Sequence, residues 1–186
     1  MYLYMNDGRF KKGPPNLIHT VAPGELALKI VRKNGDVFYC YIDAQDYDIV
    51  KDFRWTALRV PGGISFYAVT HVHENGKRLS RTMHRMLVDY PRVDHKNLNG
   101  LDNRRQNLRP ATQSQNCANR ALFRTSTSGF KGVSWHKHTK KWVARIRVHD
   151  KLIALGYFKD PTDGARAYNR AALEHFGEFA RLNPIE

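Results

Sequence analysis

The chain is poor in cysteine and in long apolar segments. Its 186 residues include two cysteines, Cys40 and Cys117, and no Cys-x-x-Cys pair. This pattern favours two reduced intracellular thiols over disulfides and argues against a structural zinc site. No apolar run approaches the roughly 18 residues of a membrane-spanning helix. Residues 1–12 are polar and charged, unlike a signal peptide, so we expect an intracellular protein that is not secreted and has no membrane partner.

Acidic residues are also scarce. There are 31 Lys and Arg residues against 17 Asp and Glu, which gives a net charge of +14. The excess rises along the chain, from +3 over residues 1–80 to +5 over 81–120 and +6 over 121–186. A polyanion is therefore expected to bind the last two segments. Nucleic acid is favoured, with membrane surfaces and acidic proteins as alternatives on charge alone.

Composition and turn signals divide the chain into four segments. Residues 1–80 are β-rich, with a hairpin at Asn34-Gly35 and a short helix over residues 44–53 capped by Asp43. Residues 81–123 hold most of the polar motifs, and the small polar residues 124–129 form a linker. Residues 130–186 predict three strands and one helix. That helix starts at Asp160-Pro161 and ends at Gly177.

The stretch from residue 93 to 116 carries the chemistry. It predicts a strand at "VDH", a loop, a second strand at "NLRPAT" and a helix. Thr112 and Gln115 form a capping-box pattern, which places Asn116 in the first turn of that helix. His95 can act as a general base, since its ordinary pKa is about 6.5. Asp94 and Asn116 offer the hard oxygen ligands that a Mg²⁺-like ion prefers.

The motifs "VDH", "DNR", "NLR" and "SQN" resemble those of HNH endonucleases of the ββα-metal fold. The closest variety is the zinc-free homing type encoded by phages and introns, and the resemblance covers most of residues 25–120. It implies that His95 is the general base, that Asn107 braces the loop, and that Asp94 and Asn116 hold Mg²⁺ or Mn²⁺.

Four neighbouring residues are expected to brace the loop or to contact phosphate: His84 of "MHR", Asn103, Arg104 and Arg109. The alternative for His84 is a buried, hydrogen-bonded histidine with no catalytic role. The alternative for each arginine is a solvated surface charge.

Alternation along the strand at 141–149 predicts two different faces. Trp142, Ala144, Ile146 and Val148 would meet the alanine-rich helix, which leaves the basic side chains exposed. "GV", "KWVARIR" and "LGYF" resemble the plant APETALA or ethylene-response-factor DNA-binding domain over residues 131–183. The family has Arg and Trp where this chain has Leu152 and Ala154. The DNA-contacting positions expected here are Lys131, Ser134, His136, Lys141, Arg145 and Arg147.

The combined expectation is an α+β protein. A ββα-metal HNH core follows a small β-rich region and precedes a three-stranded antiparallel sheet packed on one helix. The resemblance implies a metal-dependent homing-type endonuclease that cleaves double-stranded DNA at a recognised site. It needs no small-molecule cofactor and no structural zinc, and its oligomeric state is left open. The alternatives are a sequence-specific transcriptional regulator with an inactive nuclease fold and a basic RNA-associated protein.

Overall fold

A computed structural model describes residues 16–59, 65–122 and 126–185. The fold is α+β, as predicted, and it divides into two compact units, Met1–Pro110 and Ala111–Glu186. The predictions for residues 1–12 and for the first two residues of the linker lie outside the described residues. The linker boundary at 124–129 stays a prediction. Within the described ranges, no helix is long and apolar enough to cross a membrane.

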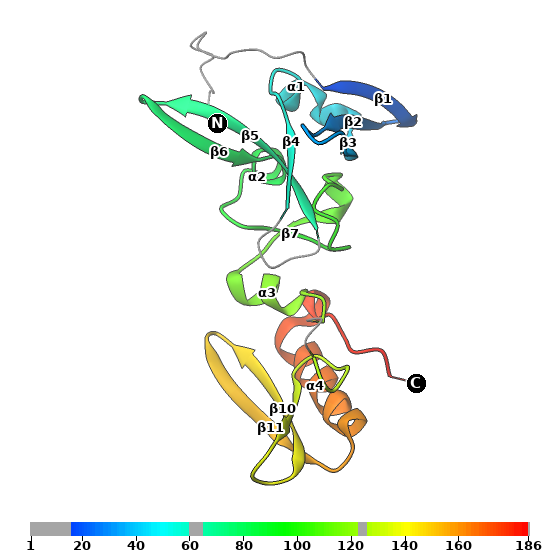
Figure 1. The fold of residues 1–186 in the computed structure, drawn as a ribbon, viewed down its shortest axis with the longest axis vertical. Helices are drawn as coiled ribbons and strands as arrows, with labels where there is room; N and C mark the ends of the chain where they lie inside the picture. Colours follow the sequence, from blue (N-terminus) through cyan, green and yellow to red (C-terminus); the bar gives the residue numbers. More distant parts are fainter. Residues whose placement is uncertain (1–15, 60–64, 123–125, 186) are drawn as a thin grey trace. The chain divides into compact units, whose positions relative to one another are not determined.

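The first unit contains small antiparallel sheets joined by short helices (Figure 1). One sheet has the order β1-β2-β3, a second has the order β4-β5-β6, and β7 pairs with β8. The strands are β1 (Leu17–Ala22), β2 (Glu25–Val31), β3 (Val37–Asp43), β4 (Thr56–Arg59), β5 (Phe66–Glu74), β6 (Lys77–Thr82), β7 (Val93–His95) and β8 (Leu108–Pro110). The helices are η1 (Ala44–Asp46), α1 (Tyr47–Val50), α2 (Met83–Val88) and η2 (Arg105–Asn107).

The predicted hairpin at Asn34-Gly35 is confirmed, because β2 and β3 pair from Glu25↔Asp43 up to Val31↔Val37. The turn needs a glycine at position 35, whose φ is +89°. The helix expected over residues 44–53 is wrong in length. It consists of η1 and α1 and ends at Val50. Asp43 makes no capping bond there, because its carboxylate accepts a hydrogen bond from the Arg105 backbone N–H at 2.7 Å instead.

One hydrophobic core holds the first unit together. It draws on the inner face of the β1–β3 sheet, on α2 and on the strands that carry the polar motifs. Trp55 is its largest fully buried side chain, and the indole N–H donates to the Val50 carbonyl oxygen at 3.0 Å. Val93 of β7 and Leu108 of β8 belong to the same core. The short β7–β8 ribbon is therefore anchored by apolar contacts that three-residue strands could not supply alone.

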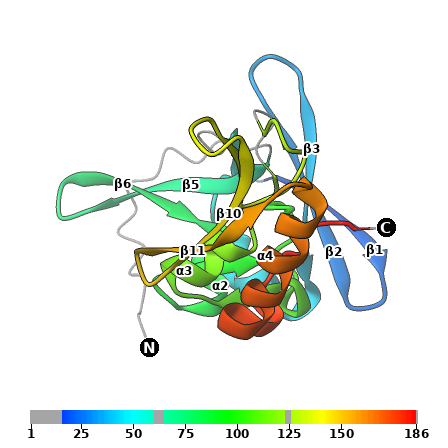
Figure 2. The ribbon, with the colours of Figure 1, turned by 90° about the horizontal axis from the view of Figure 1, so that it is seen from below.

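The second unit begins with α3 (Gln113–Ala118) and continues into a sheet of order β11-β10-β9. Its strands are β9 (Val133–His136), β10 (Lys141–Val148) and β11 (Lys151–Phe158), followed by α4 (Pro161–Phe176) and η3 (Gly177–Phe179). The predicted helix start is confirmed by the Asp160 side chain, which accepts from the Thr162 N–H at 2.6 Å. α4 packs on the sheet (Figure 2), with Ala165 against Ala144, and with Tyr168 and Ala172 against Ile146.

Candidate active site

Strand β7 carries Asp94 and His95 side by side in the chain, and β8 supplies their cross-strand neighbours. Asp94 pairs with Arg109, and His95 with Leu108. The Asp94 carboxylate is only 3% exposed, and Arg109 donates to its Oδ2 from Nε at 2.9 Å and from Nη2 at 2.8 Å. This buried ion pair offsets part of the cost of taking both charges out of water. Arg109 thus holds the carboxylate that the sequence assigns to a metal.

The His95 ring is buried among other rings. It stacks on Tyr67, with centroids 5.6 Å apart, and meets the His84 ring edge-on at 4.8 Å. Its Nε2 lies 3.3 Å from the side-chain oxygen of Asn103. Burial lowers the pKa of His95, and the contact with Asn103 opposes that shift. The ring is therefore in its neutral, proton-accepting form at neutral pH.

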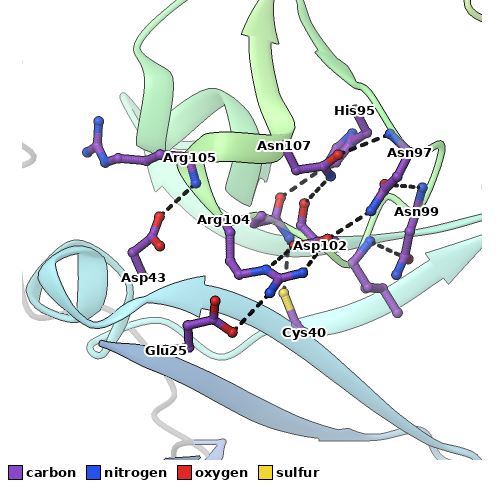
Figure 3. A network of polar contacts seen from close by, with 12 residues as sticks. Glu25, Cys40, Asp43, His95, Asn97, Asn99, Asp102, Arg104, Arg105 and Asn107 are labelled. Carbon is purple, nitrogen blue, oxygen red and sulfur yellow. Dashed lines mark hydrogen bonds and ion pairs between the residues drawn. The ribbon is translucent and has the colours of Figure 1, made fainter. Parts of the chain in front are cut away.

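Asn107 connects the two ends of the loop between β7 and β8 (Figure 3). Its side-chain nitrogen donates to the Asp102 carbonyl oxygen at 2.7 Å, and its side-chain oxygen accepts from the Asn97 N–H at 3.0 Å. Its carbonyl oxygen accepts from the Lys96 N–H at 3.0 Å. Three bonds from one residue thus fix the loop that follows His95. These are contacts of the kind that the predicted bracing role requires.

The same loop is joined to the β1–β3 sheet through its backbone. The Tyr41 N–H donates to the Leu101 carbonyl oxygen, and the Asn103 N–H donates to the Tyr41 carbonyl oxygen, each at 2.8 Å. These bonds form a parallel bridge between Tyr41 and Asp102. The loop therefore adds a short extended segment to the edge of β3. In this way the N-terminal sheet sets the position of residues close to His95.

Arg104 and Arg105 bind carboxylates of the first unit, and Figure 3 shows Arg104 between Asp102 and Glu25. Arg104 binds both oxygens of Asp102 at 2.8 Å and reaches Glu25 at 2.9 Å. Arg105 binds the buried Asp46 with Nε and Nη2. Burial raises the pKa of Asp102, but the guanidinium of Arg104 outweighs burial and the net pKa is lowered. The contacts of Arg104 favour the loop-bracing alternative over phosphate contact.

His84 lies in the first turn of α2, beside His95. Its Nε2 is 3.3 Å from the Thr82 hydroxyl, while its buried Nδ1 has no hydrogen-bond partner within the described residues. Burial, reinforced by the neighbouring His95 and Arg85, lowers the pKa of His84 to about 3. The ring is therefore neutral throughout the physiological pH range, and only one of its two nitrogens makes the hydrogen bond expected of a bracing histidine.

Asn116 belongs to α3 of the second unit. The predicted capping box is confirmed there, because the Gln115 N–H donates to the Thr112 hydroxyl and the Gln115 side chain accepts from the Thr112 N–H. Asn116 follows directly in the first turn, as the sequence predicts. In the part of the chain that the structure describes, no group of three or more His, Cys, Asp and Glu side chains could share an ion. The metal-binding roles of Asp94 and Asn116 therefore stay predictions.

Five of the six predicted DNA-contacting residues share the sheet face opposite α4. In the pairing of β9 with β10, His136 lies opposite Lys141 and Ser134 lies opposite Val143. Arg145 and Arg147 follow Val143 at two-residue steps and therefore project on the same side. Lys131, the sixth predicted residue, binds backbone carbonyl groups within the second unit. Its ammonium donates to the carbonyl oxygens of Ala118 and Arg120 at the end of α3, and burial lowers its pKa to about 8.

The sequence did not reveal several partners of His95 and of its loop. Tyr67 of β5 contacts the His95 ring, and Cys40 of β3 contacts Asn103. Glu25, Asp43 and Asp46 bind Arg104 or Arg105. The alternation of buried residues along β3 places Cys40 on the inner face, but nothing local indicates that it meets Asn103. The aspartates gave no signal either, since acidic residues near turns and helix starts are common.

Comparisons with known proteins place the chain among viral relatives. It is 27% identical, over 154 residues, to a protein named as an uncharacterized HNH endonuclease of Acanthamoeba polyphaga mimivirus; the match covers 80% of this chain and 76% of that protein. It is 34% identical to protein 3.8 of Escherichia phage T7 over 90 residues, which are 48% of this chain and 74% of that protein. The chain therefore belongs to the same family as protein 3.8.

A further match concerns a shorter stretch. Over 63 residues, or 33% of this chain, the sequence is 38% identical to an ethylene-responsive transcription factor of Arabidopsis thaliana, and the match covers 15% of that protein. No protein-family model matches the chain, and no solved structure matches it.

Gly100 offers a test of the packing around His95. A Cβ at this position would overlap the Tyr67 ring and lie 2.5 Å from the Phe66 carbonyl oxygen. Gly100→Ala must therefore displace the ring that stacks on His95. We expect it to lower the free energy of unfolding by about 1–3 kcal/mol, the usual cost of overpacking. Urea unfolding measures this loss, and a variant as stable as the wild type would show that the Tyr67 ring is not held in place.

Proposed function

We propose that the protein is a metal-dependent HNH endonuclease that hydrolyses phosphodiester bonds in double-stranded DNA. The observation that carries the proposal is the buried pair Asp94–His95 at the end of β7. Arg109, Asn103 and Asn107 hold the pair and its loop in place. The similarity to a viral protein named as an HNH endonuclease, over most of both chains, supports the same activity. Recognition of a particular site, as in homing endonucleases, is part of the proposal.

In the proposed reaction, His95 accepts a proton from the water that attacks the scissile phosphate. Tyr67 and His84 hold the plane of the imidazole, and Asn103 holds one of its nitrogens. Asn107 keeps the loop beside the ring in one conformation. The role of these neighbours is to position His95, so that little conformational freedom is lost when the transition state forms.

A divalent ion would complete this chemistry. Asp94 is the residue of the first unit that would hold Mg²⁺ or Mn²⁺, and an ion there would share the carboxylate with Arg109. The second ligand predicted from the sequence is Asn116, and its role stays a prediction. Carboxylate and amide oxygens are ligands that suit Mg²⁺. When bound, such an ion supplies a Lewis acid for the phosphate and the leaving oxygen.

Supercoiled plasmid incubated with the full chain tests the proposal. With Mg²⁺ or Mn²⁺ present we expect nicked or linear DNA, and with a chelator we expect none. Gel-shift experiments in the absence of metal should run alongside. Sequence-specific binding without cleavage under any divalent ion would support the transcriptional regulator instead. That alternative draws on the match to an ethylene-responsive transcription factor.

The second unit is proposed to supply affinity for DNA through the exposed face of its sheet. Ser134 and Arg147 are exposed there, and the His136 ring packs edge-on against Tyr157 at 5.3 Å. A small antiparallel sheet can enter the major groove, where arginine recognises guanine with two hydrogen bonds. Leu152 lies opposite Arg147 and Ala154 opposite Arg145 on β11. The face is therefore less basic on β11 than on β10.

Arg145→Ala with Arg147→Ala should weaken DNA binding and reduce its dependence on salt. Each lost phosphate contact lowers the slope of log affinity against log salt by about 1. Arg166→Ala is the matched control, because Arg166 is exposed on α4, which covers the opposite face of the sheet. Titrations by fluorescence anisotropy at several salt concentrations measure both slopes. An unchanged slope in the double variant would remove this face from the interface.

A further inference from the structure

A chain of buried side chains links the N-terminal sheet to the imidazole of His95. Cys40 of β3 lies between Met83 of α2 and Asn103 of the loop, and Asn103 in turn reaches His95. Cys40, Met83 and Asn103 are each completely buried. None of these three side chains can turn toward solvent. The direction of each hydrogen bond in the series therefore constrains the direction of the next.

The first constraint is set by Cys40. Burial raises the pKa of its thiol to about 12, so the group keeps its proton. The sulfur lies 3.4 Å from the Met83 sulfur, and a thioether can only accept a hydrogen bond. The single thiol proton is therefore directed to Met83. Toward Asn103, at 3.1 Å, the Cys40 sulfur can then act only as an acceptor.

The second constraint follows for Asn103. The group that faces the Cys40 sulfur must be a donor, so it is the amide nitrogen Nδ2. The amide oxygen then faces His95, 3.3 Å from Nε2. An amide oxygen cannot donate, so the hydrogen in this contact must come from Nε2 of the imidazole. A neutral imidazole has one N–H, and its other nitrogen, Nδ1, then carries the lone pair.

We propose that Cys40 and Asn103 are positioning residues that fix His95 in the tautomer with its proton on Nε2 and its proton-accepting lone pair on Nδ1. Tyr67 and His84 contact the faces and edges of the ring and orient its plane. The opposite tautomer would place the lone pair of Nε2 against the amide oxygen of Asn103. Flipping the Asn103 amide to avoid this would place its oxygen against the acceptor side of Cys40.

The catalytic meaning of this inference rests on the proposed nuclease function, whereas the tautomer itself does not. If His95 is the general base, water must be deprotonated at Nδ1. Loss of the Asn103 acceptor should then lower the cleavage rate by about 10- to 100-fold, as with other residues that orient a functional histidine from behind. The Cys40 sulfur would thus add to the backbone bonds of Tyr41 a second connection from the N-terminal sheet to the chemistry.

Nitrogen-15 chemical shifts of the histidine rings test the tautomer directly in the full-length protein. In the wild type we expect His95 Nε2 to show the shift of a protonated nitrogen and Nδ1 that of an unprotonated one. The reverse pattern would overturn the inference whether or not the protein cleaves DNA. A wild-type protein with the expected pattern and no cleavage would instead count against the proposed function alone.

A matched pair of substitutions tests the part played by Cys40. Cys40→Ala removes the acceptor and allows the Asn103 amide to flip, so we expect both His95 tautomers and slower plasmid cleavage. Cys40→Ser restores an acceptor and should recover the wild-type shifts and most of the rate. Ile42→Val, on the same face of β3, controls for a small loss of buried volume and should leave the shifts unchanged. Identical shifts and rates in Cys40→Ala and the wild type would exclude Cys40 from this role.

Discussion

Replacing His95 by alanine is expected to reduce plasmid cleavage by about 100- to 10,000-fold, the usual contribution of a positioned general base. The physical reason is that, among the residues whose positions the structure describes, none near His95 is a base of comparable strength. His84 is the nearest imidazole, but burial lowers its pKa to about 3, so it is a much weaker base. Single-turnover conversion of supercoiled plasmid, with Mg²⁺ in excess, measures the loss.

Two further variants make this result interpretable. His95→Asn keeps a polar side chain of similar reach under Tyr67 and separates loss of the base from loss of packing. His73→Ala, on the exposed side of β5, controls for the removal of a histidine as such and should cleave like the wild type. DNA affinity should be retained in all three, since binding is assigned to the second unit. Cleavage by His95→Asn at the wild-type rate would refute the assignment of the base.

Replacing Arg109 by methionine is expected to destabilise the first unit by about 3–5 kcal/mol, because it leaves the Asp94 carboxylate buried without its ion-pair partner. Asp94 is 3% exposed and Arg109 is 9% exposed, so water cannot readily replace either partner. Asp94→Asn should also be destabilising, since it leaves the guanidinium facing a neutral amide. Urea unfolding of Arg109→Met, of Asp94→Asn and of the variant that carries both substitutions gives the coupling energy of the pair.

The double variant also separates stability from catalysis. Asp94→Asn with Arg109→Met should be more stable than either single variant, because no unpaired buried charge remains. It should nevertheless cleave no DNA, since the proposed metal ligand is lost. Strictly additive losses in the free energy of unfolding would contradict a direct interaction between the two side chains.

Short-range features of this chain were predictable from the sequence. The capping box of Thr112 and Gln115, the start of α4 at Asp160-Pro161 and the turn at Asn34-Gly35 all formed where expected. Each depends on groups within a few residues of one another, so the local sequence contains all the interacting partners. The order strand, loop, strand and helix around His95 was predictable for the same reason. The helix after Asp43 was predicted too long, since it ends at Val50. The Asp43 carboxylate, which was expected to cap its start, accepts a hydrogen bond from the Arg105 N–H instead, a tertiary contact that the local sequence does not contain.

The partners of the polar residues were decided only by the tertiary structure. Cys40 and Asn103 are 63 residues apart in the chain, and Arg105 and Asp46 are 59 residues apart. The sequence offers many carboxylates for Arg104 and Arg105, and the choice depends on which side chains the hydrophobic core brings to the same place. The sequence therefore predicted that His95 is a base held by a polar loop. The contact of that loop with β3, and the hydrogen-bond directions that select one nitrogen of the ring, arise only when the two segments pack together.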